Sequence, residues 1–125
     1  MASIILAAVE DLFFLARIQE TARRTGVGVE AVNPATLGQE LQVHPGREVS
    51  AIILDLNCRF VSAVELLRAL KTAPSTRGIP VVGFVSHVQG DLIAAARSAG
   101  CDTVLARSAF TAQLPELLTR LASTN

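Results

Sequence analysis

The chain has 125 residues, of which 50% are hydrophobic, so it is long enough for one domain with a buried core and too short for two. Its 11 basic and 11 acidic residues cancel, which disfavours binding to nucleic acid or to an anionic membrane surface through net charge. The apolar runs fall far short of the roughly 20 residues that a transmembrane helix needs. We therefore expect a single domain over residues 1–125.

The amino-terminal segment and the two cysteines favour a cytoplasmic location. No basic segment precedes the first apolar run, and Glu10 and Asp11 follow it at once, unlike the pattern of a secretory signal peptide. Cys58 and Cys101 have no neighbours with the spacing of zinc ligands. We expect both to be ordinary reduced thiols, as in cytosolic proteins.

Five short apolar runs rich in β-branched residues predict five strands. Each run is largely apolar and does not alternate, which is typical of parallel strands buried on both faces between layers of helices. The predicted strands are residues 3–9, 27–32, 49–55, 80–86 and 102–106. The segments between these strands are then expected to be helices.

Three of the connecting segments show the i, i+3, i+4, i+7 spacing of an amphipathic helix. These apolar stripes lie within residues 63–70, 92–99 and 114–121. Ser62 with Glu65 forms a capping box before the first of them, and Gly26 and Gly100 suit helix ends. Strand and helix thus alternate five times, and right-handed crossovers turn that alternation into an open parallel α/β sheet covered on both faces.

Two further helix starts are less regular. Asn33 followed by Pro34 supplies an N-cap and a first-turn proline. Thr111 can cap the last helix, but Pro115 removes a backbone donor four residues later. We therefore expect the regular part of the last helix to begin near Leu114.

Polar residues follow four of the predicted strands at their carboxyl ends, where open parallel sheets gather functional groups. These residues are Glu10, Asp11, Asp55, Asn57, Ser86 and Arg107. Three carboxylates brought together repel one another. Binding of Mg²⁺, which prefers oxygen ligands, is the simplest way to relieve that repulsion. The hydroxyl of Ser86 and the cation of Arg107 opposite these carboxylates would complete a site in which Asp55 can accept a phosphoryl group.

Most of these residues also have a purely structural interpretation. Glu10 and Asp11 are alternatively solvated turn residues or favourable charges at a helix N-terminus. Ser86 is then an ordinary polar strand end and Arg107 a surface cation. Asp55 is harder to explain in this way, because nothing local requires a carboxylate at the end of a core strand.

At these residues the chain resembles the receiver domain of bacterial two-component response regulators, the CheY-like phosphoryl-accepting module. The resemblance covers nearly all of the chain. It is carried by Ala-Val-Glu-Asp at residues 8–11, Ile-Ile-Leu-Asp-Leu-Asn at residues 52–57, and the segment from Leu66 to Val82. It implies a flavodoxin-like (βα)5 doubly wound parallel sheet with strand order 2-1-3-4-5.

The resemblance also implies roles for individual residues. Asp55 becomes the phosphoacceptor, and a histidine kinase or phosphotransfer protein becomes the donor. Glu10, Asp11 and Asp55 become the carboxylate ligands of Mg²⁺, with the backbone carbonyl of Asn57 as a further ligand. His87 lies beside this group and either affects access to it or is a solvated polar residue.

Several positions depart from the family pattern. Arg107 stands where the family has a lysine that pairs with the acceptor carboxylate, and Ser108 follows it in place of a proline, so we expect no cis-proline turn. Val104 stands where many receivers have an aromatic switch residue. Ser86 matches the switch hydroxyl only with one extra residue after the acceptor, since an ungapped match puts Val85 there.

We expect a stand-alone receiver, not an enzyme, that signals through contacts with an unknown output protein. The alternative is a pseudo-receiver, an interaction module of the same fold that is not regulated by phosphorylation, as positions 104, 107 and 108 suggest. A flavin carrier fits poorly, because negative charge and bulky side chains follow the first strand where a phosphate cradle is needed. Small apolar residues on the last two helices are compatible with a homodimer.

Overall fold

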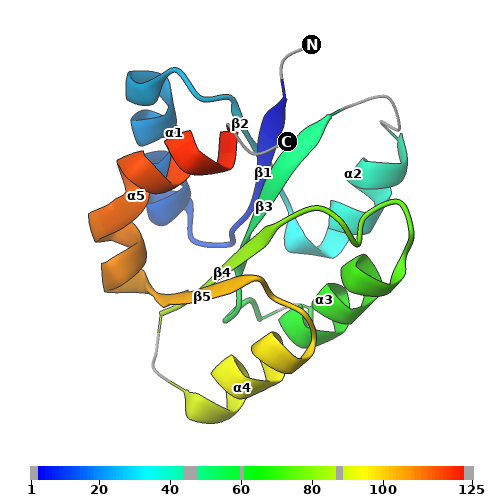
Figure 1. The fold of residues 1–125 in the computed structure, drawn as a ribbon. Coiled ribbons are helices and arrows are strands. Elements are labelled where there is room, and N and C mark those ends of the chain that lie inside the picture. Colours follow the sequence, from blue (N-terminus) through cyan, green and yellow to red (C-terminus); the bar gives the residue numbers. More distant parts are fainter. Residues whose placement is uncertain (1–2, 44–47, 60, 87–88, 123–125) are drawn as a thin grey trace.

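The fold is an open sheet of five parallel strands, seen in a computed structural model that describes residues 3–43, 48–59, 61–86 and 89–122 (Figure 1). The strands lie in the order β2-β1-β3-β4-β5. Their bounds are β1 (Ile4–Ala8), β2 (Val29–Val32), β3 (Val49–Asp55), β4 (Val81–Val85) and β5 (Thr103–Ala106). The predicted α/β class and strand order are confirmed.

Helices connect the successive strands and cover both faces of the sheet (Figure 1). They are α1 (Leu12–Thr25), the 3-10 helix η1 (Pro34–Thr36) with α2 (Leu37–Val43), α3 (Ala63–Thr72), α4 (Gly90–Ser98) and α5 (Arg107–Ala122). Helices α1 and α5 pack on one face, and α2, α3 and α4 pack on the other. In the part of the chain that the structure describes, no helix has the length and apolarity to cross a membrane.

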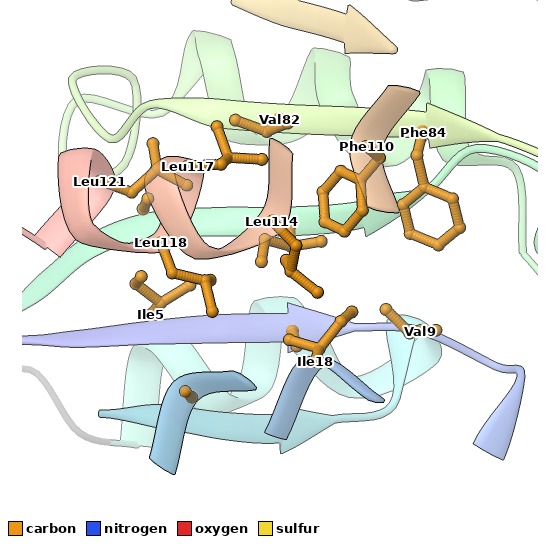
Figure 2. Close-up of a cluster of buried hydrophobic side chains, with 14 of the residues drawn as sticks. Ile5, Val9, Ile18, Val82, Phe84, Phe110, Leu114, Leu117, Leu118 and Leu121 are labelled. Atoms are coloured by element: carbon orange, nitrogen blue, oxygen red, sulfur yellow. The ribbon is translucent and has the colours of Figure 1, made fainter. Parts of the chain in front are cut away.

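Each face of the sheet has its own hydrophobic core. Leucines on one side of α5, Leu114, Leu117 and Leu118 among them, point toward the strands in the core beneath α1 and α5 (Figure 2). Strands β1, β3 and β4 are almost wholly buried, as predicted. The same prediction is wrong for β2 and β5, which are largely half-buried or exposed, because the strand order places them at the two edges of the sheet.

Local capping signals set several helix ends as the sequence predicts. The hydroxyl of Ser62 accepts the N–H of Glu65 at 3.2 Å at the start of α3. The side chain of Asn33 accepts the N–H of Ala35 at 2.9 Å and begins η1. Gly26 ends α1 with a φ of 74°, a left-handed conformation that glycine adopts at little cost.

The start of α5 differs from the prediction. The helix begins at Arg107, directly after β5, and not near Leu114, so Pro115 lies inside it. Thr111 is not an N-cap, since its hydroxyl donates to the carbonyl of Arg107 at 2.9 Å within the helix. The prediction fails because a proline removes only one backbone donor, whereas the buried face of α5, which begins with Phe110, stabilises the helix on both sides of it.

Candidate functional site

Asp55 ends β3 near the middle of the sheet and is only 6% exposed. Its Oδ1 accepts the N–H of Asn57 at 2.9 Å. Burial raises the pKa of Asp55 above its ordinary value, and the nearby negative charge of Glu10 raises it further. The backbone N–H groups of Asn57 and Glu10 and the positive charge of Arg107 act in the opposite direction. Such a desolvated carboxyl group with charged neighbours is typical of functional sites.

Replacing Asp55 with asparagine is expected to raise the Tm near pH 7, with a gain that shrinks as the pH falls toward about 4. The pKa of Asp55 is higher in the folded chain than in the unfolded chain, so stability is lost as the pH rises from the unfolded pKa through the folded pKa. Asparagine carries no charge to desolvate and keeps an oxygen for the N–H of Asn57. Thermal unfolding followed by circular dichroism at several pH values measures the effect.

Asp102 provides a control of opposite sign for that prediction. Its Oδ2 lies 2.7 Å from Nζ of Lys71 and accepts the N–H of Val81 at 2.8 Å. Asp102→Asn removes a paired charge, so it is expected to lower the Tm near pH 7. An Asp55→Asn variant that is less stable than the wild type near neutral pH contradicts the effect that we assign to burial.

Glu10 and Asp11 follow β1 at the same edge of the sheet, but their carboxylates have different partners. Both carboxylate oxygens of Glu10 accept the N–H of Arg59, each at 3.0 Å. Oδ1 of Asp11 accepts the N–H groups of Phe13 and Phe14 at 3.0 and 3.1 Å and caps α1. The interpretation of Asp11 as a favourable charge at a helix N-terminus is therefore confirmed. The hydrogen bond from Phe14 is the main cause that lowers the pKa of Asp11.

Arg107, the first residue of α5, reaches across to the start of α1. Its Nη2 lies 3.0 Å from Oδ2 of Asp11, and its guanidinium carbon lies 4.2 Å from the ring centroid of Phe14. The resemblance implied a cation paired with the acceptor carboxylate Asp55, but here the ion pair is with Asp11. The charge of Arg107 still lowers the pKa of Asp55. Within the described residues there is no cis peptide bond, in line with the expectation for Ser108.

Asn57 connects two loops through its side chain. Its Oδ1 accepts the N–H of Ser86 at 2.6 Å, and its Nδ2 donates to Oε1 of Gln89 at 3.3 Å. Gln89 is the N-cap residue of α4. The sequence predicted a role only for the backbone carbonyl of Asn57. It did not indicate Gln89, because no local pattern pairs two residues that lie 32 positions apart.

Of the positions that the family resemblance links to switching, the structure describes Ser86 and Val104. Ser86 is the exposed residue directly after β4, whereas Val85 is 1% exposed and belongs to the core, so the polar position at this strand end is Ser86. Val104 in β5 is half-buried, lies opposite Gly83 and packs against the core on the side of α3 and α4. His87 lies outside the described residues.

The acidic side chains do not surround one point. Among the residues that the structure describes, no three His, Cys, Asp or Glu side chains are close enough together to hold a metal ion. Glu10 and Asp55 accept backbone N–H groups, and Asp11 pairs with Arg107. The residue types suit Mg²⁺, but this arrangement does not fit a preformed site for it. Binding of Mg²⁺ therefore stays a prediction.

Cys58 lies beside this group of residues. Burial, followed by the negative charges of Asp55 and Glu10, raises the pKa of the Cys58 thiol to about 11. Its Sγ donates to the carbonyl of Val61 at 3.3 Å. Cys58 and Cys101 are both free, so the expectation that neither forms a disulfide is confirmed. A thiol with so high a pKa is a poor nucleophile at neutral pH.

Comparison with known proteins identifies the fold. No protein-family model and no curated protein sequence matches the chain. Among solved structures, the Mn(2+)-bound form of response regulator Rcp1 is similar with a TM-score of 0.81 and 18% identity, over 98% of this chain and 96% of that one. The receiver domain of a signal transduction histidine kinase from Syntrophus aciditrophicus has a TM-score of 0.83 and 21% identity, over 98% of this chain and 91% of that one.

A third structure, the phosphorylated cyanobacterial phytochrome response regulator RcpA, is similar with a TM-score of 0.78 and 23% identity. The match covers 97% of this chain and 91% of that one. Each of these likenesses extends over nearly the whole chain, although few residues are identical. The fold of this chain is the flavodoxin-like fold of response regulator receiver domains.

Proposed function

We propose that this chain is a receiver module that accepts a phosphoryl group on Asp55 and signals in the cytoplasm through protein contacts. The position of Asp55 carries the proposal: it is a largely desolvated carboxyl group at the carboxyl end of a central strand, in a sheet with the receiver fold. The similar structure of RcpA is described as phosphorylated. The donor that we propose is a phosphohistidine on a histidine kinase or phosphotransfer protein.

The proposed reaction transfers the phosphoryl group between two side chains. A carboxylate oxygen of Asp55 attacks phosphorus and forms a P–O bond, while the P–N bond to the donor histidine breaks. The leaving nitrogen keeps the electron pair of that bond and takes a proton from water. The N–H of Asn57 orients the carboxylate, and the charge of Arg107 offsets part of the negative charge that collects there.

The proposal includes the Mg²⁺ dependence that the family resemblance implies. One similar structure, that of Rcp1, is a Mn(2+)-bound form. The carboxylates of this chain are not arranged around one point, so the need for Mg²⁺ is tested separately from the identity of the acceptor.

A pseudo-receiver is the second candidate, and one observation favours it. Arg107 already neutralises Asp11, one of the carboxylates that would hold Mg²⁺, through a 3.0 Å ion pair. A module of this kind binds a partner protein through its fold and needs no phosphodonor. It therefore predicts no covalent change at Asp55.

Intact mass after incubation with a small phosphodonor separates the two candidates. The wild type is expected to gain one phosphoryl group, more rapidly with Mg²⁺ than with a chelator. Asp55→Asn is expected to gain none, whereas Asp91→Asn, which changes an exposed carboxylate at the start of α4, is expected to behave as the wild type. No uptake by a folded wild type, or equal uptake by Asp55→Asn, contradicts the proposal, and the first result favours the pseudo-receiver.

A further inference from the structure

The carboxylate of Asp11 has a protein donor on each of its oxygens. Oδ1 accepts two backbone N–H groups at the start of α1, from Phe13 and Phe14. Oδ2 is 3.0 Å from Nη2 of Arg107. The guanidinium therefore already occupies one binding direction of Oδ2, and a second cation that approaches this oxygen meets its positive charge.

Two further features fix the position of Arg107. Its guanidinium lies over the ring of Phe14 at 4.2 Å, and this ring packs against Phe84 and Phe110 with centroid separations of 4.8 and 5.6 Å. The face of the Phe14 ring, held by its two neighbours, therefore supports the cation. Because α5 begins directly after β5, the backbone of Arg107 is also fixed by the sheet.

The location of this cation is unfavourable for the helix that carries it. Arg107 is the first residue of α5, and a positive charge at a helix N-terminus opposes the helix dipole. The ion pair with Asp11 and the stacking on Phe14 offset that cost. Contacts with Asp11 and Phe14 therefore hold Arg107 in place, although its charge is unfavourable for α5 itself.

We propose that Arg107 is an internal counter-ion that competes with divalent cations for Asp11, so that a metal ion binds this edge only when the Arg107–Asp11 ion pair opens. This inference concerns the site of the proposed function and rests on it. It accounts for the pairing of Asp11 with a cation at an edge where, among the described residues, no three acidic side chains are grouped so as to hold a metal ion.

The competition also predicts which change opens the site. Removing the guanidinium frees Oδ2 of Asp11 and removes one positive charge that acts on Asp55. A divalent cation is then attracted by a more negative local charge and can bind the Asp11 carboxylate without displacing an arginine. Methionine in place of Arg107 keeps an unbranched apolar stem against the Phe14 ring and carries no charge.

Direct binding of Mn²⁺ tests the proposal, with the free ion measured by electron paramagnetic resonance. Arg107→Met is expected to lower the Kd for Mn²⁺ by about tenfold or more relative to the wild type. Arg68→Met is the matched control, because it removes the same charge from an exposed ion pair with Glu65 on α3. It is expected to change the Kd by less than about twofold. Adding Asp11→Asn to Arg107→Met is expected to abolish the gain.

Equal Mn²⁺ affinity of the wild type and Arg107→Met overturns the proposal, and so does an equal gain in Arg68→Met. Arg107→Gln provides a second uncharged variant in case the methionine variant does not fold, and circular dichroism confirms folding. Mn²⁺ is also expected to raise the Tm of Arg107→Met more than that of the wild type, since ligand binding to the folded state stabilises it.

The Mn²⁺ measurement needs no phosphodonor, so it fails independently of the proposed function. Phosphoryl uptake on Asp55 together with unchanged Mn²⁺ affinity in Arg107→Met contradicts only the counter-ion proposal. A gain in Mn²⁺ affinity in Arg107→Met without any phosphoryl uptake on Asp55 contradicts only the phosphoacceptor proposal.

Discussion

Replacing Phe110 with alanine is expected to lower the free energy of unfolding by about 3–5 kcal/mol. Phe110 is fully buried beside Phe84 (Figure 2). The centroid of its ring lies 5.6 Å from that of Phe14 and 5.2 Å from that of Phe84. Alanine loses the burial of the ring and leaves a cavity that the β4 and α5 backbones, fixed by their own hydrogen bonds, can close only in part. Since most domains are stable by only about 5–15 kcal/mol, the variant is expected to be close to unfolding at physiological temperature.

Phe13 is the matched control for this substitution. It is the same residue type, one position before Phe14 on α1, but it is 91% exposed. Phe13→Ala is expected to change the free energy of unfolding by less than about 0.5 kcal/mol. Urea unfolding followed by circular dichroism compares the two variants, which suits a chain that has no tryptophan or tyrosine. A loss in Phe110→Ala as small as that in Phe13→Ala would show that the ring cluster does not stabilise the fold.

Adding a single methyl group at Gly83 is expected to cost about 1–3 kcal/mol. A Cβ at this position of β4 would lie 2.8–3.0 Å from three side-chain carbons of Leu56, the residue that follows Asp55. Leu56 is 3% exposed and packed in the core on the side of α3 and α4, so it has little room to move away. The absence of a side chain at Gly83 therefore creates the space that Leu56 occupies beside the proposed acceptor.

Two further variants isolate this contact. Gly38→Ala on α2 also adds one methyl group to a glycine, but no heavy atom outside the adjoining helix backbone lies within 4 Å of the new Cβ. Because alanine favours a helix, the variant is expected to be neutral or more stable by up to about 1 kcal/mol. Combining Gly83→Ala with Leu56→Ala is expected to cost less than the sum of the two single changes, because the second removes the clash. Additive losses in urea unfolding would mean that the clash is not the cause.

The order of secondary structure was predictable because its signals are local. The continuous apolar run that ends at Asp55 identifies a buried parallel strand, and a capping box identifies the start of α3. The prediction failed at the start of α5, where Pro115 was given too much weight. A proline signal is local, but the buried face of α5 packs against residues of β1, β3, β4 and α1, which lie far away in the sequence.

The location of the candidate site was predictable for the same reason. Parallel strands bring their carboxyl ends to one edge, so the strand ends alone indicated that Glu10, Asp55 and Arg107 lie near one another. In the folded chain the charges of Glu10 and Arg107 both act on the pKa of Asp55, in opposite directions. The identity of each partner was not predictable. A single strand end does not specify whether Asp11 binds a metal ion, a helix terminus or an arginine 96 residues away.

The amino-acid sequence by itself determined the alternation of strands and helices, the edge at which the polar residues gather and the carboxyl group at the end of the third strand, because these depend on the periodicity and capping of neighbouring residues. Only the tertiary structure decided that Asp11 pairs with Arg107, that Glu10 accepts the N–H of Arg59 and that the Asn57 side chain reaches Gln89. Such pairings depend on side-chain directions and on distances between distant parts of the chain, which are set when both layers of helices pack on the sheet.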